Sequence, residues 1–328
     1  MKHLVCLFAV LAAVSACKKK QENKETAPTK GSAAEATQPA DAVAAAAPAD
    51  AAAKEWDGKS PLPISEGFQT PESVLYDADA DIYLVSNING EPLGTDDNGF
   101  ISKVSPEGKV TELKWIDGAK DNVKLDAPKG MAIAGGVLYV ADINVVRQFD
   151  AKTGEPKGDI KVPGATFLND VAAAPDGGVY VTDSGLDPKF QPTGTDAVYH
   201  IGKDGKVKPL IKDKTLGAPN GVAAGDKGSV WVVTFGSGEI YQVDAKGKKV
   251  TPQKLPQGQL DGIVLLDGGD VLVSSWAASA VYRGKPGGEW KPVVENVKSP
   301  ADIGYDTKRH RVLIPVFQGN TVILQPLE

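Results

Sequence analysis

The stretch LNDVAAAPDGGVYVTD, residues 168–183, contains the unit that decides the fold. A polar residue, Asn169, begins a short apolar run, which the turn PDGG and the strand-like run VYVTD follow. Asn disfavours strands, whereas a Gly- and Asp-rich turn between two apolar runs is typical of a hairpin. The stretch therefore predicts two antiparallel strands, with a polar residue at the entrance of the first.

Five further stretches share this pattern: TPESVLYDADADIYLVSN (70–87), APKGMAIAGGVLYVAD (127–142), APNGVAAGDKGSVWVVT (218–234), LDGIVLLDGGDVLVSS (260–275) and SPADIGYDTKRHRVLIP (299–315). Their leading polar residues are Glu72, Lys129, Asn169, Asn220, Asp261 and Asp302, at spacings of 57, 40, 51, 41 and 41 residues. A period near 40 with four strands per unit is typical of a β-propeller. The sequence predicts an all-β, six-bladed propeller over residues 56–328; a β-sandwich or two β-domains are the alternatives.

The two ends of the repeat region predict how the ring closes. The sixth unit ends after its third strand, NTVILQPL, while SPLPISEGFQTPES near residue 60 resembles the fourth strand that precedes another unit, WKPVVENVKSPAD. We expect residues 61–66 to supply the outer strand of the last blade, which would remove an open sheet edge.

The N-terminal region has a different composition. Residues 1–16 combine a short basic start with an apolar run too short to span a bilayer, which is typical of a cleavable signal peptide. Residues 17–55 are rich in Ala, Pro, Lys and Glu and predict a disordered tether. The residues before Cys17 resemble a bacterial lipobox, which implies cleavage before Cys17, its lipidation (palmitate included) and a membrane anchor; an ordinary signal peptide is the alternative.

Composition limits the partners. The formal net charge is -6 and no basic stripe occurs, so nucleic acid is a poor candidate. Cys6 lies inside the predicted signal, so one cysteine would remain and no internal disulfide could form. Lys18, directly after Cys17, is not the Asp associated with inner-membrane retention. We therefore expect the protein at the cell envelope, on the outer membrane if the host has two membranes. We also expect it to be a monomer.

The lead residues predict a ligand site on the ring axis. The first strand of each propeller blade lines the central channel, so residues at the strand entrances converge. Glu72, Asn169, Asn220 and Asp261 would then offer two carboxylates and two amides, and oxygen donors suit Ca²⁺ or Mg²⁺. The alternative for each residue alone is a turn-capping role.

These motifs resemble the senescence-marker-protein, gluconolactonase and regucalcin group of six-bladed propellers. The resemblance rests on Glu72 in TPESVLY, Asn169 in LNDVAAAPDGG, Asn220 in APNGVAA and Asp261 in LDGIVLL. It implies that Glu72, Asn220 and Asp261 bind a catalytic divalent metal, that Asn169 binds metal or substrate, and that Asp261 is the general base.

Other residues are candidates for contact with a substrate. Lys129 would oppose metal binding, pair with Glu72 or attract an anionic substrate. The loops 86–99 and 184–196 should surround the metal, as should Phe235, Trp276 and Phe317, which follow second strands; blade packing is the alternative for these aromatics. His200 and His310 lie in strand and hairpin contexts that do not indicate catalysis.

Two classes of function remain open. The first is a metal-dependent hydrolase of lactones or related esters, in which Asp261 activates water. The second is a non-catalytic propeller that binds a ligand or a protein at the cell envelope, because fold does not fix function. A serine hydrolase is disfavoured, since FGSGE lacks the G-x-S-x-G spacing.

Overall fold

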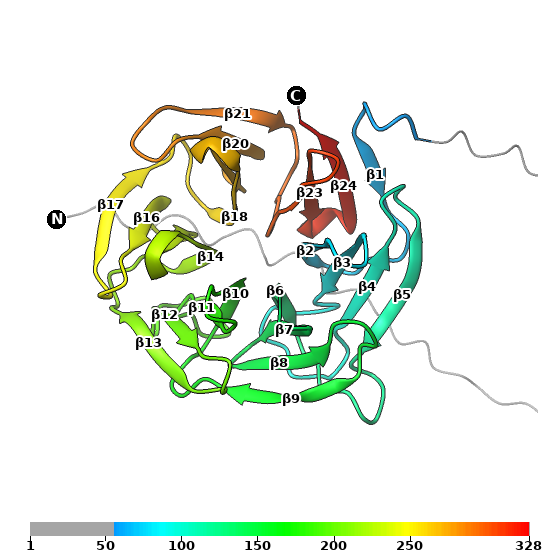
Figure 1. The fold of residues 1–328 in the computed structure, drawn as a ribbon, viewed down its shortest axis with the longest axis horizontal. Coiled ribbons are helices and arrows are strands. Elements are labelled where there is room, and N and C mark those ends of the chain that lie inside the picture. Colours follow the sequence, from blue (N-terminus) through cyan, green and yellow to red (C-terminus); the bar gives the residue numbers. More distant parts are fainter. Residues whose placement is uncertain (1–55, 328) are drawn as a thin grey trace, which may run out of the picture. The chain divides into compact units, whose positions relative to one another are not determined.

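The computed structural model describes residues 56–327, which form six four-stranded antiparallel sheets arranged as the blades of a ring (Figure 1). The predicted six-bladed propeller is confirmed. The predicted signal peptide, Cys17 and the tether lie outside the described residues. No helix in the described part of the chain is long and apolar enough to cross a membrane.

The first three blades follow the chain from the axis outward. Blade 1 contains β2 (Pro71–Asp77), β3 (Ile82–Asn87), β4 (Phe100–Val104) and β5 (Val110–Asp117). Blade 2 contains β6 (Pro128–Ala134), β7 (Val137–Asp142), β8 (Val145–Asp150) and β9 (Pro156–Lys161). Blade 3 contains β10 (Leu168–Ala173), β11 (Val179–Asp183), β12 (Ala197–Ile201) and β13 (Val207–Lys212).

The next two blades repeat this order, and the last differs. Blade 4 contains β14 (Pro219–Ala224), β15 (Val230–Thr234), β16 (Glu239–Val243) and β17 (Lys249–Lys254). Blade 5 contains β18 (Leu260–Leu265), β19 (Val271–Ser275), β20 (Ala280–Gly284) and β21 (Trp290–Glu295). Blade 6 contains β22 (Gly304–Asp306), β23 (Arg311–Val316), β24 (Thr321–Pro326) and β1 (Leu62–Ile64), which is the first strand along the chain. Three single-turn 3₁₀ helices lie in connections, η1 (Asp226–Gly228), η2 (Asp267–Gly269) and η3 (Phe317–Gly319).

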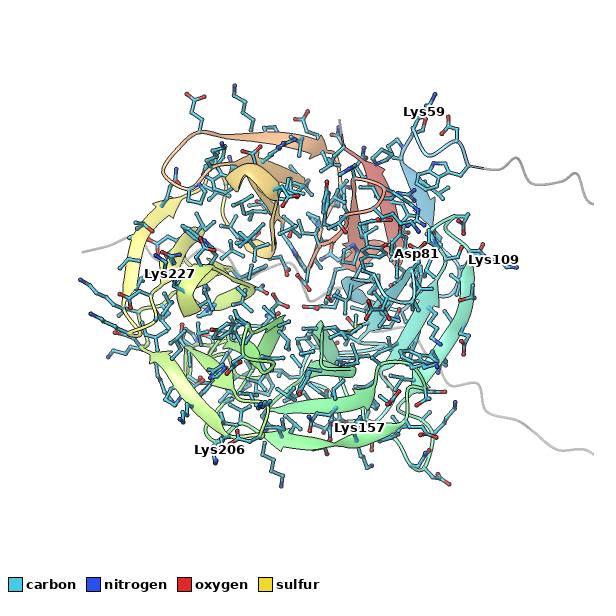
Figure 2. All side chains as sticks on the ribbon, in the orientation of Figure 1. Lys59, Asp81, Lys109, Lys157, Lys206 and Lys227 are labelled. Atoms are coloured by element: carbon cyan, nitrogen blue, oxygen red, sulfur yellow. The ribbon has the colours of Figure 1, made fainter. Side chains whose placement is uncertain are left out.

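The ring closes through β1, as expected for residues 61–66. β1 pairs antiparallel with β24, with Leu62 opposite Leu324 and Ile64 opposite Val322. Polar contacts join blades 1 and 6 as well: the Arg309 guanidinium donates to Asp81 at 2.7 Å (Asp81 is labelled in Figure 2). The pairing satisfies strand edges that would otherwise be open.

The hydrophobic core is divided into six clusters, one between each pair of neighbouring blades. The second strand of a blade is buried on both faces because it packs between two neighbours; all five residues of β11 and of β19 are buried. This explains why second strands such as VWVVT in β15 are nearly continuous apolar runs. Lysines such as Lys157 and Lys206 project outward from the rim (Figure 2).

Each inner strand has a β-bulge near its start. In blade 3, Leu168 pairs with Asp183 and Val171 pairs with Val181, so the inner strand advances three residues while its partner advances two. Blades 1, 2, 4 and 5 show the same irregularity at the same place. A bulge re-aims the side chain of the extra residue, and here it does so at equivalent positions around the axis.

Candidate metal and substrate site

We call the second residue of each inner-strand segment its lead position, and the end of the ring where inner strands begin its entry face. Five predicted leads lie at this position: Glu72, Lys129, Asn169, Asn220 and Asp261. Each is 6% exposed or less. The inner strands surround the ring axis (Figure 1), so residues far apart in the sequence occupy equivalent places beside it.

The sixth lead is Ala301, and the expectation that Asp302 occupies this place was wrong by one residue. Pro300 pairs with Val316 and Gly304 with Leu313, which places the bulge as in the other blades, with Ala301 directly after the first paired residue. The hydroxyl of Ser274 donates to the Ala301 carbonyl at 2.8 Å, just as the hydroxyl of Thr182 donates to that of Asn220 at 2.6 Å. Asp302 therefore belongs to the next layer along the axis.

Four of the six leads present an oxygen that has no partner. Glu72 Oε2, Asn169 Oδ1, Asn220 Oδ1 and Asp261 Oδ1 are buried and accept no hydrogen bond from any described residue. A buried polar atom without a partner costs about 1–3 kcal/mol, so four such atoms at equivalent positions indicate polar partners that the described residues do not supply. The two leads outside the set, Lys129 and Ala301, have no side-chain oxygen to offer.

The orientation of the Asn169 amide follows from its neighbour. The Ser184 hydroxyl donates its only proton to the Pro219 carbonyl at 2.6 Å, so it accepts from Asn169 Nδ2 at 3.1 Å. The amide nitrogen is thereby held and the oxygen is left free. Such outer contacts commonly orient the groups that bind a metal.

The layer beside the leads contains Asp170 and Asp302 among small residues. Asp170 accepts from the backbone N–H groups of Val171 at 2.6 Å and Val222 at 2.7 Å, so both of its oxygens are satisfied. Asp302 accepts from the Ser73 hydroxyl at 2.5 Å. A Cβ on Gly130 would come within 2.2 Å of the Asp170 carboxylate, so only glycine fits there. The carboxylates of this layer are thus hydrogen-bonded within the protein, unlike the oxygens of the leads.

Burial dominates the electrostatics of the axis. It raises the pKa of Glu72, Asp170 and Asp261 well above the usual range, and neighbouring carboxylates add to the effect. Burial also raises the pKa of Asp302 to about 7, against the opposing Ser73 hydrogen bond. With these four carboxylates and one lysine ionised, the axis would carry a net charge of −3, which favours protons or a cation.

The surroundings of Lys129 exclude one of its three expected roles, an ion pair with Glu72. Its Nζ donates to the Ala127 carbonyl at 2.9 Å and lies 4.9 Å from the centre of the Phe167 ring. No carboxylate of residues 56–327 lies within 4 Å of Nζ, so Lys129 forms no ion pair with Glu72. Burial lowers the pKa of Lys129 to about 8, although the nearby charge of Glu72 opposes this shift. A binding role for an anionic group remains a prediction.

Three aromatic residues follow second strands on the entry face, as expected from the sequence. Phe235 and Trp276 have ring centres 5.5 Å apart, and Trp276 and Phe317 have ring centres 5.1 Å apart. The indole Nε1 of Trp276 is buried and has no hydrogen-bond partner among the described residues. Trp276 directly follows Ser275, which pairs with Leu260, and its backbone N–H donates to the Gln259 carbonyl, so Trp276 lies beside the start of the strand that carries Asp261.

The two long loops lie on the same face. Residues 88–99 connect β3 to β4, and residues 184–196 connect β11 to β12, at the end where inner strands begin. The second loop positions Ser184 and Phe190, whose ring lies 6.2 Å from that of Phe167. His200, in contrast, contacts Asp176 at 3.1 Å in the turn at the opposite end of β11. It therefore lies toward the opposite end of the blade from the lead residues.

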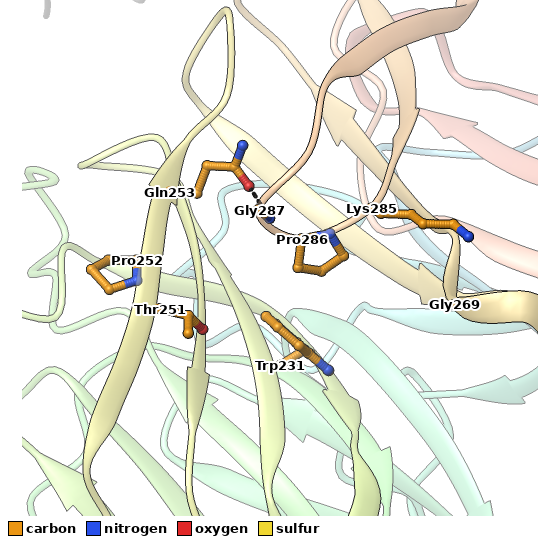
Figure 3. A pocket seen from close by; sticks show the side chains of 8 residues that line it. All are labelled: Trp231, Thr251, Pro252, Gln253, Gly269, Lys285, Pro286 and Gly287. Atoms are coloured by element: carbon orange, nitrogen blue, oxygen red, sulfur yellow. Dashed lines mark hydrogen bonds between the residues drawn. The ribbon is translucent and has the colours of Figure 1, made fainter.

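A groove in the described residues lies away from the lead positions. It has a volume of about 650 Å³ and lies between blades 4 and 5, lined by Trp231, Lys285 and residues 251–253 of β17 (Figure 3). Gln253 crosses this region and accepts from the Gly287 N–H at 2.8 Å. None of the lead residues lines it, so this groove is separate from the lead positions.

Within residues 56–327, no three His, Cys, Asp or Glu side chains are placed to hold a metal by themselves. An ion among the leads would therefore need the oxygens of Asn169 and Asn220 as well as the two carboxylates. Such mixed oxygen sets fit Ca²⁺ better than Zn²⁺ or Cu²⁺. On this chemistry, the unpartnered atoms fit a hard divalent cation.

The family model described as SMP-30/gluconolactonase/LRE-like region matches residues 101–304, which is more than half of the chain. The chain belongs to this family. The expected resemblance is thus confirmed at the level of the family. No curated protein matches the sequence.

Solved structures in this fold include a gluconolactonase from Xanthomonas campestris, with 19% identity, a TM-score of 0.63, and coverage of 82% of this chain and 89% of that chain. A putative gluconolactonase shows 18% identity and a TM-score of 0.63, covering 83% and 95%. Virginiamycin B lyase from Staphylococcus aureus shows 15% identity and a TM-score of 0.60, covering 82% and 99%. At these identities the likeness establishes the fold.

Proposed function

We propose that this member of the family is a divalent-cation-dependent hydrolase of lactones or related esters. The observation that carries the proposal is the set of four buried, unpartnered oxygens on Glu72, Asn169, Asn220 and Asp261. These residues would hold the cation. When bound there, Ca²⁺ or Mg²⁺ would supply positive charge that polarises a carbonyl oxygen.

Asp261 acts as the general base in this proposal. Its carboxylate takes a proton from water as the water oxygen bonds to the lactone carbonyl carbon. The bond from that carbon to the ring oxygen then breaks, and the proton passes to the departing oxygen to give a hydroxy acid. The buried, unpartnered indole N–H of Trp276 is proposed to donate to Asp261 and so to favour the ionised carboxylate that this step requires.

The other residues of the axial site position and balance these groups. Ser184 holds the Asn169 amide so that its oxygen stays free. Lys129 provides a buried positive charge on the opposite side of the ring from blade 5 and is proposed to attract a polarised or anionic part of the substrate. Phe235 and Trp276 are proposed to contact the rest of the substrate.

The test separates catalysis from simple binding. Calcium binding to the chelator-treated, full-length protein is measured by calorimetry, and hydrolysis of a panel of simple lactones is followed with and without chelator. Calcium-dependent turnover supports the proposal. Calcium binding without turnover favours the alternative, a ligand- or protein-binding propeller, and absence of any divalent-cation binding contradicts the enzyme proposed here.

We also propose, from the sequence before and after Cys17, that the protein is anchored by lipid to the cell envelope, on the outer membrane where two are present. Metabolic labelling with a palmitate analogue should mark the wild-type chain and not a Cys17→Ser variant. Equal labelling of both would contradict the anchor.

A further inference from the structure

The three aromatic residues of the entry face occupy one repeated position. In each case the residue directly follows the second-strand residue that pairs with the start of the inner strand. The backbone N–H of Phe235 donates to Ala218 at 3.0 Å, that of Trp276 to Gln259 at 3.0 Å, and that of Phe317 to Ser299 at 3.1 Å. The propeller repeat therefore delivers three aromatic rings to equivalent places in blades 4, 5 and 6.

These rings form a continuous surface, which we call the aromatic wall (Phe235, Trp276 and Phe317). Trp276 is in the middle, with one ring edge-on at 5.5 Å and the other tilted at 5.1 Å. Each member is partly exposed, so ring surface remains free for a ligand. Aromatic faces of this size contribute strongly to binding when they are covered by apolar groups.

The equivalent positions in the other half of the ring carry no aromatic residue. They are Ile88 in blade 1, Ile143 in blade 2 and Ser184 in blade 3. Ile88 is only 1% exposed and belongs to the core, while Ser184 is engaged in orienting Asn169. The aromatic wall is thus confined to blades 4 to 6, and its middle member, Trp276, lies beside the start of the strand that carries Asp261.

Hydroxyl groups near the wall are committed to the protein. Ser275 donates to the Gly258 carbonyl at 2.8 Å. Thr234 accepts from the Glu239 N–H at 2.8 Å and donates to its carbonyl at 3.1 Å, and Ser237 contacts the Glu239 carboxylate at 3.1 Å. A sugar-derived lactone would place hydroxyls against rings that cannot replace their bonds to water, which is costly.

We infer that the preferred substrates are lactones that carry an apolar aryl or alkyl substituent, rather than polyhydroxylated sugar lactones. The inference rests on the proposed function and specifies its substrate class. The lactone carbonyl lies toward the axial oxygens and Asp261, and the substituent lies on the aromatic wall. The apolar area that it buries there favours binding, whereas a polyol loses solvation without compensation.

The experiment compares γ-phenyl-γ-butyrolactone with glucono-δ-lactone on the full-length protein with Ca²⁺. We expect kcat/KM for the phenyl lactone to exceed that for the sugar lactone by about tenfold or more. Trp276→Ala and Phe317→Ala should each reduce this ratio by about tenfold, mainly through KM. Trp231→Ala, which changes the same residue type in the groove between blades 4 and 5, is the matched control and should leave the ratio unchanged.

Two further arms make the outcome decisive. Trp276→Phe keeps an aromatic ring but removes the N–H, so the preference should persist while kcat falls. Calorimetry with the corresponding lactams, which are not hydrolysed, measures binding without turnover: the phenyl lactam should bind more tightly than a polyhydroxylated lactam, and Trp276→Ala should abolish the difference.

The possible failures are distinct. If no lactone is hydrolysed, the proposed function fails, and the lactam arm alone decides whether the wall binds apolar rings. If the sugar lactone is turned over as well as or better than the phenyl lactone, the substrate class is wrong although the proposed function stands. A phenyl preference that survives all the wall alanine variants also overturns the inference.

Discussion

Blades 1 to 3 and blades 4 to 6 share one backbone plan but present different chemistry on the entry face. The first half contributes Glu72, Lys129 and Asn169 together with two long loops. The second half contributes Asn220, Asp261 and the aromatic wall. The bulge and the strand register are the same in both halves, so the difference lies in side chains at repeated positions.

This comparison shows how a repeat fold separates position from function. Pairing and packing fix where the lead and wall residues lie, because each blade buries its second strand between neighbours. The residues at those places are then free to differ between blades. The result is an entry face with oxygen donors beside the axis, the buried Lys129 in blade 2 and aromatic rings in blades 4 to 6.

The largest expected effect comes from substitution of Asp261, the lead residue of blade 5, the blade that also carries Trp276. Asp261→Asn keeps the shape but removes the charge and the proposed general base, so kcat should fall about 10³-fold, close to 4 kcal/mol of transition-state stabilisation. Steady-state kinetics with saturating Ca²⁺ measure the loss. Asp302→Asn, one layer away, should change kcat less than tenfold; equal losses would remove the distinction between the two layers.

The buried carboxylates predict an unusual pH dependence for the metal-free protein. The pKa of Asp302 is raised to about 7, above its value in an unfolded chain, so the folded protein binds more protons than the unfolded chain between about pH 4 and pH 7. Stability should therefore fall as the pH rises through this range, by up to about 4 kcal/mol from Asp302 alone. Glu72, Asp170 and Asp261 shift in the same direction.

Urea unfolding at pH 5, 6, 7 and 8 in chelator tests this dependence. Excess Ca²⁺ should flatten it, because a cation stabilises the ionised carboxylates, and Asp302→Asn should reduce it in the absence of the cation. A free energy of unfolding that increases from pH 5 to pH 8 in chelator would show that burial does not disfavour the ionised forms of these carboxylates.

The fold was predictable from the sequence because the repeat encodes it several times. Six hairpins at a period near 40 indicated the blades, and the likeness of residues 61–66 to other fourth strands indicated the closing strand. The sixth lead was misplaced because its acidic residue, Asp302, was matched to the other polar leads. Counting from the proline would have found Ala301, since Pro71, Pro128, Pro219 and Pro300 all occupy the same register position.

Other features of the site depend on contacts that sequence does not display. That Ser184 orients Asn169 follows from a donor bond to Pro219 in the next blade. The separation of Lys129 from Glu72 follows from its bond to the Ala127 carbonyl. The free indole N–H of Trp276 depends on where its ring packs. These are relations between blades, whereas a repeat pattern describes each blade separately.

A smaller effect is expected from substitution of Lys129, the only lead residue with a positive charge. Burial lowers the pKa of Lys129 to about 8. Below pH 8 the folded protein contains a buried, charged ammonium group, which lowers the free energy of unfolding. This destabilisation decreases as the pH rises from 8 and is gone above the unfolded pKa near 10.5. Lys129→Met should stabilise the metal-free protein by about 1–3 kcal/mol at pH 7 and tighten Ca²⁺ binding about tenfold.

Thermal or urea unfolding and calorimetry measure the two effects of Lys129→Met. Lys124→Met, which changes an exposed lysine paired with Asp97, is the control and should change both quantities little. A variant that is less stable and binds Ca²⁺ more weakly would mean that the lysine charge is needed to balance the carboxylates.

The smallest effect concerns the orientation of one amide. Ser184→Ala removes the acceptor of Asn169 Nδ2, so the amide is free to turn its nitrogen toward the axis, and Ca²⁺ affinity should fall about tenfold. The lost hydrogen bonds should also cost about 1–2 kcal/mol of stability. Ser275→Ala loses a comparable bond, from its hydroxyl to the Gly258 carbonyl at 2.8 Å, without contact to a lead. Both variants should lose stability, but only Ser184→Ala should lose affinity by calorimetry; equal affinity in the two would mean that Asn169 is held by other contacts or is not a ligand.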